Sequence, residues 1–428
     1  MLRKLCVGIL ILSVLWEAGL RMYPRVIPAR LLINFQEDLR REIAHRTQWP
    51  TIHDTVLLDR DDGGPPLRIF KPFTRIAFKI KTLGGVQSET MDKMGFCNPP
   101  QNSYDLGAID IITIGDSFTW CTSVHAEDTW TSRLSSFTGR SVYNLGKEGI
   151  GPYEYIQIFK KLGAPKAPRV VVMSIYEGND LRDALEYRFY KLAAEGQPAG
   201  PEVSSDCRVK ESPWCVLCFA LRRGPMGRFS YAWNLTVTAL DYIRQGTQRL
   251  LLRVFGSRGR DDSKVNFRYR LALPGEVVPF NVSNTDKDEV VHAKCLRDRQ
   301  IDLEVFTEAL RDFLRLSRRY GFAPVVTYIP SAHTTYAATV VFDQPALSDL
   351  MPWFSRAQRS YFKTKATELG YVFVDLTPAL QAAAAANGIR NLLYDPVNLH
   401  LTQRGHAVVA EALSGAIRSS AVALQPRP

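Results

Sequence analysis

Apolar segments rich in strand-forming residues alternate with helix-like segments along much of this chain, and this alternation constrains the fold most strongly. The clearest strand, IDIITI at 109–114, is an almost continuous apolar run, as expected where both faces of a strand are covered. Similar strands are predicted at 141–146, 169–176, 323–330 and 371–376. The pattern therefore predicts an α/β fold in which a parallel sheet carries helices on both faces.

Helices are predicted between these strands. From 301 to 320, apolar residues recur every three or four positions, which is the stripe of an amphipathic helix. Gly321 follows this stripe, where a left-handed helix cap favours glycine. Further helices are expected at 153–163, before Gly370 and at 402–414.

The 428 residues suggest one large domain with additions. Residues 1–22 join Arg3 and Lys4 to an apolar run with no small-residue cleavage site after it. We therefore predict an uncleaved signal anchor, which would hold the protein at a membrane outside the cytoplasm. The remaining parts are a lead-in at 23–105, the main domain at 106–185 and 298–420, and a long insertion at 186–297 that covers or borders the site.

Charge and cysteine content narrow the class further. The net charge of +11 is spread over the chain without one long basic run, and neither zinc-finger spacing nor a Walker-type loop is present. We read this as a basic surface and expect no nucleic-acid partner. Six of the seven cysteines follow the anchor and could form three disulfides in an exported protein. The C-x-x-C at Cys215 and Cys218 has no second pair beside it, so we interpret it as structural.

The first predicted strand ends directly at Gly115, Asp116 and Ser117. Ligands bind at the carboxyl ends of the strands in a parallel sheet, so Ser117 is expected where a substrate would lie. A serine hydroxyl becomes a good nucleophile only when a base removes its proton, and the oxyanion that then forms needs hydrogen-bond donors. Taken alone, Ser117 would be better explained as a helix N-cap.

Four stretches in chain order resemble the motif blocks of the SGNH, or GDSL-type, hydrolases. They are GDSFT with Ser117, NLGKEGIG with Gly149, EGND with Asn179, and HLTQRGH beginning at His400. The longer string GDSFTWCTSVHAEDTW is similar to the form found in membrane-anchored bacterial members. The resemblance implies a flavodoxin-like three-layer sandwich in which Ser117 is the nucleophile and His400 the base. It also implies an oxyanion hole made by Ser117, Gly149 and Asn179, and no metal or organic cofactor.

The triad acid departs from that pattern. The family places it three or two residues before the histidine, where this chain has Val397 and Asn398. The nearest carboxylate is Asp395, five residues before His400, and we predict that it orients the imidazole. The alternative is that Asn398 or a main-chain carbonyl orients the ring, which would leave a Ser–His dyad.

The resemblance implies a serine esterase that cleaves carboxylic esters, O-acetyl groups on carbohydrate in particular. Its partners would be an ester-bearing small molecule or an acetylated glycan, and a membrane through residues 1–22. The alternatives are an O-acetyltransferase acting on an envelope polysaccharide and a non-catalytic protein that binds glycan or serves as a scaffold. We further predict a disulfide between Cys97 and Cys121, a shaping role for Asp116 in the serine turn, and a surface position for His406.

Overall fold

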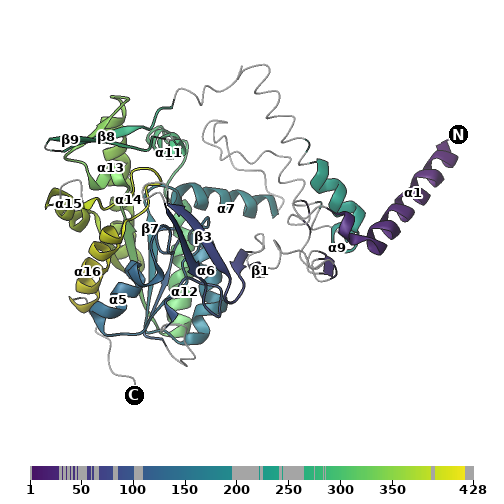
Figure 1. The fold of residues 1–428 in the computed structure, drawn as a ribbon, viewed down its shortest axis with the longest axis horizontal. Helices are drawn as coiled ribbons and strands as arrows, with labels where there is room; N and C mark the ends of the chain where they lie inside the picture. The colour runs from purple at the N-terminus through teal and green to yellow at the C-terminus, as the bar shows by residue number, and fades with distance from the viewer. Residues whose placement is uncertain are drawn as a thin grey trace. The chain divides into compact units, whose positions relative to one another are not determined.

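The structure is a computed structural model (Figure 1). It describes residues 2–27, 55–58, 60–61, 67–80, 85–100, 109–194, 225–240, 265–273, 275–282, 286–386 and 391–419, and the single positions 31, 35, 39, 42, 43, 46, 221, 243 and 284. The predicted C-x-x-C, Cys215 and Cys218, lies outside these residues.

The chain divides into two compact units, which we describe separately. The first contains Met1–Lys71, Tyr190–Ala199 and Lys210–Asp262, and the second contains Pro72–Phe189, Gly200–Val209 and Ser263–Pro428. The second unit thus includes part of the predicted lead-in and the end of the predicted insertion.

The first unit contains the long helix α1 (Leu2–Met22), the short turn η1 (Pro24–Val26) and the helix α9 (Pro225–Phe229). Its strands β1 (Thr55–Leu58) and β2 (Leu67–Phe70) form an antiparallel pair. A small buried cluster joins the end of α1 to residues far along the chain: Leu20, Ile27, Phe35, Leu39, Ile43 and Tyr231.

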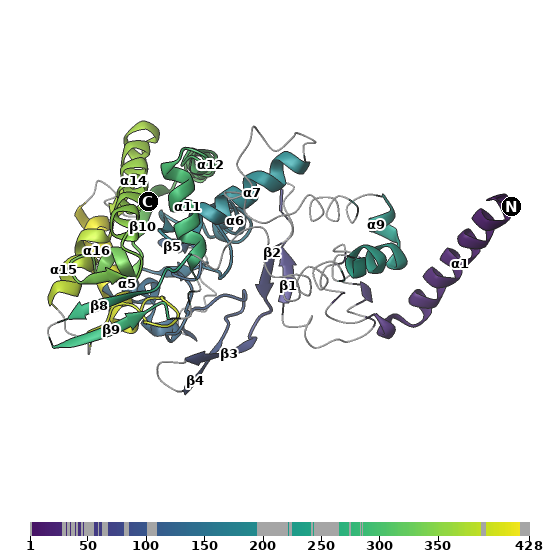
Figure 2. The same cartoon turned by 90° about the horizontal axis from the view of Figure 1, so that it is seen from above.

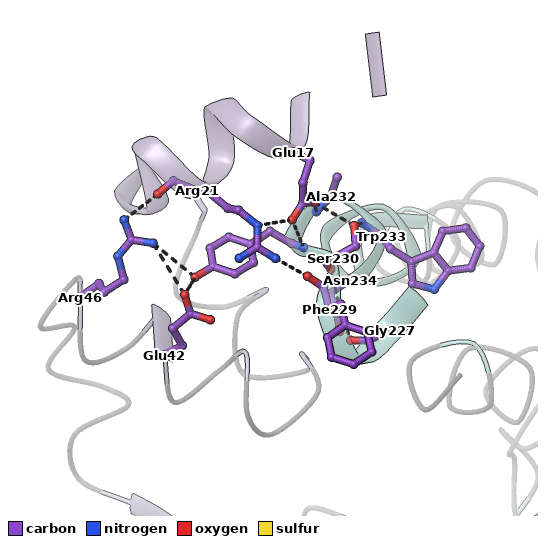
Figure 3. A network of polar contacts seen from close by, with 11 residues as sticks. Glu17, Arg21, Glu42, Arg46, Gly227, Phe229, Ser230, Ala232, Trp233 and Asn234 are labelled. Carbon is purple, nitrogen blue, oxygen red and sulfur yellow. Dashed lines mark hydrogen bonds and ion pairs between the residues drawn. The ribbon is translucent and has the colours of Figure 1, made fainter. Parts of the chain in front are cut away.

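Glu17 interrupts the apolar character of α1, and Figure 3 shows the partners of its carboxylate. It accepts hydrogen bonds from Ser230 Oγ at 2.8 Å and from the backbone N–H groups of Tyr231 at 3.1 Å and Ala232 at 2.9 Å. Residues 231–240 are helical, so Glu17 satisfies N–H groups that the first helical turn leaves free. Arg21 donates to Glu17 at 2.7 Å and lies over the Tyr231 ring. Glu17 therefore has a structural role at the end of α1.

Among the residues that the structure describes, no helix has both the length and the apolar character needed to cross a membrane. The anchor predicted at residues 1–22 stays a prediction.

The second unit is built on a five-stranded parallel sheet, as the sequence predicts. Its order is β6-β5-β7-β10-β12, which is the 2-1-3-4-5 order of flavodoxin-like sheets. All residues of β5, β6 and β7 are buried, which explains their unbroken apolar sequence. The strands are β5 (Ile111–Ile114), β6 (Val142–Asn144), β7 (Val170–Tyr176), β10 (Ala323–Ile329) and β12 (Val372–Asp375).

Helices cover both faces of this sheet and complete the three-layer sandwich. Figure 1 shows α5 (Trp130–Thr138) and α16 (Gln403–Ser419), which pack together, on one side of the sheet, and α6 (Pro152–Ile158) and α12 (Val305–Tyr320) on the other. In the view of Figure 2, α12 lies beside β10, and α14 (Leu347–Leu369) contacts α12 and β12. The predicted α/β sandwich is confirmed.

The helix ends follow the sequence signals closely. Gly321 has φ +72° and its N–H caps α12 by donating to the Ser317 carbonyl at 2.8 Å. Gly370 ends α14 with φ +84°. α6 continues as a π-helical turn from Phe159 to Gly163, the residue at which its end was predicted. The last helix, α16, extends five residues beyond the predicted Ser414.

Two smaller antiparallel sheets have no counterpart in the predicted pattern. One pairs β3 (Arg75–Ile80) with β4 (Gly85–Thr90). The other contains β8 (Tyr269–Leu273), β9 (Glu276–Phe280) and β11 (Val340–Phe342). β8 alternates buried and exposed side chains, as a half-covered strand should. It is followed, after β9, by the helix α11 (Lys287–Arg297), which reaches the site described below.

A disulfide joins Cys97 to Cys121, with the Cα atoms 6.1 Å apart, as predicted. Both cysteines are fully buried. The neighbouring Asn98 extends this connection, because it donates to the Asn144 carbonyl at 3.0 Å and accepts from the Asn144 N–H at 2.9 Å. The segment before the first strand is thereby fixed to the edge strand β6 and to the turn that follows the serine.

Candidate active site

Ser117 lies in a tight turn that begins where β5 ends. The Asp116 carbonyl accepts from the N–H groups of Thr119 and Trp120, and the Asp116 carboxylate accepts from the Phe118 N–H at 2.9 Å. A Cβ at Gly115 would lie 2.1 Å from Thr119 Oγ1, so the turn needs glycine there. Asp116 therefore shapes the turn, as predicted, and presents Ser117 at the carboxyl end of the sheet.

His400 reaches Ser117 from 283 residues away in the chain. Its Nε2 lies 2.9 Å from Ser117 Oγ, and its Nδ1 lies 2.9 Å from the main-chain oxygen of Asn398. A carbonyl only accepts, so Nδ1 must carry the proton of the neutral ring. Nε2 is then the unprotonated nitrogen, which can accept the serine proton.

The Asp395 carboxylate is not the group that faces His400 Nδ1, so the prediction of Asp395 as the orienting acid is wrong and the carbonyl alternative applies. Asp395 Oδ1 instead accepts from the N–H groups of Val397 at 2.8 Å and Asn398 at 2.9 Å. The segment from Asp395 to His400 forms a closed loop, because the Asp395 N–H donates to the His400 carbonyl at 2.8 Å. The carboxylate thus shapes the loop that presents the Asn398 carbonyl.

Two further contacts hold the imidazole in place. The Phe118 ring stacks on it, with centroids 4.7 Å apart and 21° between the planes. Leu399 has φ +61°, a left-handed conformation that non-glycine residues rarely adopt. This backbone turn lies between the Asn398 carbonyl and the His400 ring that it contacts. The Asn398 side chain, in turn, donates to Ser123 Oγ at 2.7 Å and accepts from the His400 N–H at 3.0 Å.

Burial sets the protonation state of this base. Burial lowers the pKa of His400 to about 4, although the Asn398 carbonyl and the charge of Asp395 act in the opposite direction. The ring is therefore neutral at pH 7. Burial likewise raises the pKa of Asp116 to about 7, with the Phe118 N–H opposing and the charge of Asp183 adding to the increase.

The predicted oxyanion residues border the same pocket as the pair. Gly149 and Asn179 line it together with Ser117 and His400. Gly149 has φ +68°, which favours glycine at this position. Asn179 follows β7, the neighbour of β5, and its Nδ2 donates to Asp183 Oδ2 at 2.7 Å. The Asn179 side chain also lowers the pKa of Asp116 by hydrogen bonding, so a ligand would share its two amide hydrogens with the Asp183 and Asp116 carboxylates.

The pocket has a volume of about 210 Å³. It lies at the carboxyl ends of β5 and β7, between which the strand order reverses, and this is where flavodoxin-like sheets bind ligands. The lining comes from several elements: Ser117, Phe118, Gly149, Tyr176, Gly178, Asn179, Arg182, Asp286, Asp288, Glu289, His292, Asn398, Leu399 and His400.

Beside the pocket, Glu177, Glu289 and His333 place ligand atoms within 4.8 Å of one another, and all three are buried. His333 Nε2 lies 2.9 Å from Glu289 Oε1. The carboxylates also accept from hydroxyl groups, such as Ser331 Oγ on Glu289 at 3.0 Å and Thr334 Oγ1 on Glu177 at 2.6 Å. Burial alone would lower the pKa of His333, but both carboxylates raise it above its usual value. We interpret the group as a hydrogen-bonded ion cluster, because its oxygens already have protein donors.

His406 is not at the surface, contrary to our prediction. Its side chain is 1% exposed, and its Nδ1 accepts from the Trp130 N–H at 3.1 Å. Burial lowers the pKa of this ring to about 3. The apolar stripe of the last helix, through Val409, Ala410 and Leu413, places residue 406 on the packed side, and this signal could have located it.

Sequence reasoning missed two kinds of group at the site and named a third, the carbonyl that orients His400, only as an alternative. The Asn398 carbonyl is a backbone atom, which no residue type announces. Glu177 stands inside the EGND motif, but its distant partners cannot be read from spacing. The residues of α11 lie in a stretch that we treated only as an insertion, although we expected such an insertion to border the site.

The sheet order, the serine turn and the Ser117–His400 contact together have the arrangement of an SGNH-type serine hydrolase, the class that the four motifs predict. No model of a known protein family matches the chain. No curated protein matches it significantly in sequence.

Solved structures do match, at 12–14% identity. One, from Desulfitobacterium hafniense DCB-2, is described as a lipolytic protein of the G-D-S-L family; the match covers 72% of this chain and 99% of that one, with a TM-score of 0.34. Another is an acetylxylan esterase from Geobacillus stearothermophilus, with coverage of 76% and 100% and a TM-score of 0.35. With TM-scores of this size, the function has to be inferred from the chain's own residues.

Proposed function

We propose that this protein is a serine esterase that cleaves short carboxylic esters through an acyl-enzyme on Ser117. The observation that carries the proposal is the 2.9 Å contact between Ser117 Oγ and His400 Nε2, with Nδ1 held by the Asn398 carbonyl. This arrangement leaves Nε2 unprotonated beside the serine hydroxyl, as a general base must be.

In the proposed reaction, His400 Nε2 removes the proton of Ser117 as Oγ attacks the ester carbonyl. The negative charge that develops on the carbonyl oxygen receives hydrogen bonds from the N–H groups of Ser117 and Gly149 and from Asn179 Nδ2. The protonated ring then gives its proton to the departing alcohol oxygen. Water, activated by the same nitrogen, attacks the acyl-enzyme and releases the acid and free Ser117.

The size of the pocket favours a short acyl group. Its volume of about 210 Å³ is below the roughly 300–1,000 Å³ of sites that hold drug-sized ligands. An acetyl group with part of its alcohol would fit such a volume better than a long fatty acyl chain. The polar lining, with Asn179 and Arg182 among it, favours a hydroxylated alcohol, and we propose O-acetylated carbohydrate as the substrate class.

Labelling with a fluorophosphonate tests the nucleophile. We expect one label per chain on the native protein and none on Ser117→Ala. The matched control is Ser348→Ala, because Ser348 is an exposed serine on α14. A native protein that stays unlabelled, or a Ser117→Ala variant that labels as well as the control, would contradict the proposal and favour a glycan-binding or scaffold role.

The acceptor of the acyl group is a separate question. Acetate release and acetyl transfer are measured together, with an acetyl ester as donor and increasing concentrations of an unacetylated sugar. With an esterase, the rate of acetate release does not fall as the sugar concentration increases. An O-acetyltransferase forms acetylated sugar at the expense of acetate.

We also propose that residues 1–22 associate the protein with lipid. Apolar side chains of α1 are more than half exposed, namely Ile11, Leu12, Val14, Leu15 and Trp16. Co-sedimentation of the full chain with phospholipid vesicles is the test. We expect the Leu12→Asp/Leu15→Asp variant to lose this binding while it keeps esterase activity, and equal binding of both proteins would contradict the proposal.

A further inference from the structure

The pocket has a second set of lining residues that the four motifs do not include. Asp286, Asp288, Glu289 and His292 come from the beginning of α11, and Arg182 comes from the helix α7 (Asp180–Ala194). We call the four residues from 286 to 292 the α11 wall. The proposed reaction uses none of them, because the acyl-transfer chemistry is complete with Ser117, His400 and the oxyanion donors.

His292 is the member of the wall whose chemistry is unexplained by the protein itself. Its side chain is only 4% exposed, and its Nδ1 has no hydrogen-bond partner within the part of the chain that the structure describes. Burial lowers the pKa of this ring to about 4, although the charge of Asp288 and a hydrogen bond to the Asp288 main chain act in the opposite direction, so the ring is neutral at pH 7. A buried polar atom without a partner is unfavourable, and one that lines a pocket can be satisfied by a ligand.

The charge of the wall is negative. The Asp286, Asp288 and Glu289 carboxylates line the pocket together with one guanidinium, that of Arg182. This guanidinium already donates to Asp183 at 2.9 Å and lies 3.8 Å from Glu186, so its charge is matched outside the wall. Glu289 is paired with His333, which leaves the charges of Asp286 and Asp288 in excess. Asp288 is exposed and Asp286 is half-buried, so both can meet a ligand that enters from solvent.

We infer that the α11 wall recognises the alcohol portion of the ester, with His292 Nδ1 making one hydrogen bond to it and the carboxylates accepting from its hydroxyl or ammonium groups. The wall therefore selects uncharged or cationic polyhydroxylated alcohols and disfavours alcohols that carry a carboxylate. This inference rests on the proposed esterase function, since it names the substrate of the same site. His292 acts by binding, and the reaction at the carbonyl does not require it.

The physical reason for the selectivity is electrostatic. Like charges in a partly desolvated site repel strongly, since a pair at about 4 Å interacts by a few kcal/mol at the effective dielectric constant near a protein surface. Hydroxyl groups suffer no such repulsion and supply the donors that carboxylates need. A hexoside and the corresponding uronate, each with the same acetyl ester, differ only in this respect and make the matched substrate pair.

The experiment compares three acetyl esters at pH 8. Burial, and then the charge of Glu289, raise the pKa of Asp286 to about 6, so Asp286 is ionised at this pH. p-Nitrophenyl acetate has no sugar hydroxyls to meet the wall and reports the basic reaction. An acetylated methyl hexoside and the acetylated methyl glycoside of the corresponding uronic acid, whose carboxylate is free, report the wall. We expect the native protein to have at least roughly tenfold higher kcat/KM for the hexoside than for the uronate, and the ratio to fall as salt is added.

Two sets of variants separate the effect of the wall's negative charge from the effect of the His292 hydrogen bond. Asp286→Asn/Asp288→Asn should raise kcat/KM on the uronate about tenfold and change the hexoside less than about threefold. His292→Leu should raise KM for the hexoside about two- to tenfold, the usual effect of one hydrogen bond, with kcat nearly unchanged, and His292→Gln should restore much of the loss. Asp298→Asn, at the other end of α11 and exposed, is the control and should change none of these values.

The outcomes separate the two levels of the proposal. A protein that neither cleaves p-nitrophenyl acetate nor reacts with a fluorophosphonate contradicts the esterase function itself. A protein that cleaves p-nitrophenyl acetate but treats hexoside and uronate equally contradicts only the α11 wall. A fall in kcat on p-nitrophenyl acetate in His292→Gln as large as in His292→Leu would likewise overturn the binding role, because it would indicate a structural effect on the catalytic residues.

Discussion

The loop that orients His400 gives the sharpest prediction, which concerns Asp395→Asn. In a triad enzyme, loss of the orienting acid lowers kcat roughly 10,000-fold. Here the ring nitrogen faces the Asn398 carbonyl, and the substituted amide side chain keeps an Oδ1 that can accept from the N–H groups of Val397 and Asn398. Only the charge is lost, and its influence on the pKa of His400 is smaller than that of burial or of the Asn398 carbonyl. We expect kcat/KM to fall no more than about tenfold, since a pKa change of one unit corresponds to about 1.4 kcal/mol.

The assay is hydrolysis of p-nitrophenyl acetate by purified variants whose thermal unfolding matches that of the native protein. His400→Ala sets the scale of complete loss, on the order of 10⁶-fold in kcat for a catalytic base of this kind. Asp349→Asn, an 83% exposed side chain on α14, is the neutral control. A loss of roughly 1,000-fold or more in a folded Asp395→Asn protein would refute the carbonyl-oriented pair and restore the carboxylate as the third catalytic group.

Three other predictions follow from the same site. Asn179→Ala should lower kcat for p-nitrophenyl acetate about 100- to 1,000-fold with little change in KM, because a donor to the developing oxyanion is removed. A rise in KM of about the same factor, with kcat unchanged, would count against that role. The rate should fall only below about pH 4, because His400 becomes protonated there and cannot accept the Ser117 proton, and an acid limb near the ordinary histidine pKa of about 6.5 in the kcat/KM profile would contradict this. Cys97→Ser/Cys121→Ser should lose about 3–4 kcal/mol of unfolding free energy for a loop of 24 residues, measured by urea denaturation, whereas a loss within error would show that the bridge is not stabilising.

Much of the fold and the core of the site could be predicted from the sequence because both depend on strand ends. β5, β7 and β10 are apolar along almost their whole length, so they could be recognised as covered strands. Ser117 and Asn179 follow two of these strands directly. The parallel sheet then brings together residues that the chain separates.

The rest depended on information that side-chain patterns do not carry. The Asn398 carbonyl acts through the backbone, and its direction is set by the unusual φ of Leu399. The charge of the α11 wall depends on which part of the predicted insertion at 186–297 reaches the pocket. The periodicity of apolar residues does not determine which part that is. Asp395 was chosen because it was the nearest carboxylate in the chain, but a loop that turns back on itself separates nearness in sequence from contact with the ring.

The bridge between Cys97 and Cys121 places a covalent bond four residues beyond the nucleophile. Its formation requires an oxidising environment, so a chain still exposed to cytosolic thiols would carry the serine turn without this restraint. If the chain is exported, as residues 1–22 lead us to predict, the turn that carries Ser117 would become fixed only after translocation, although the sheet could assemble earlier.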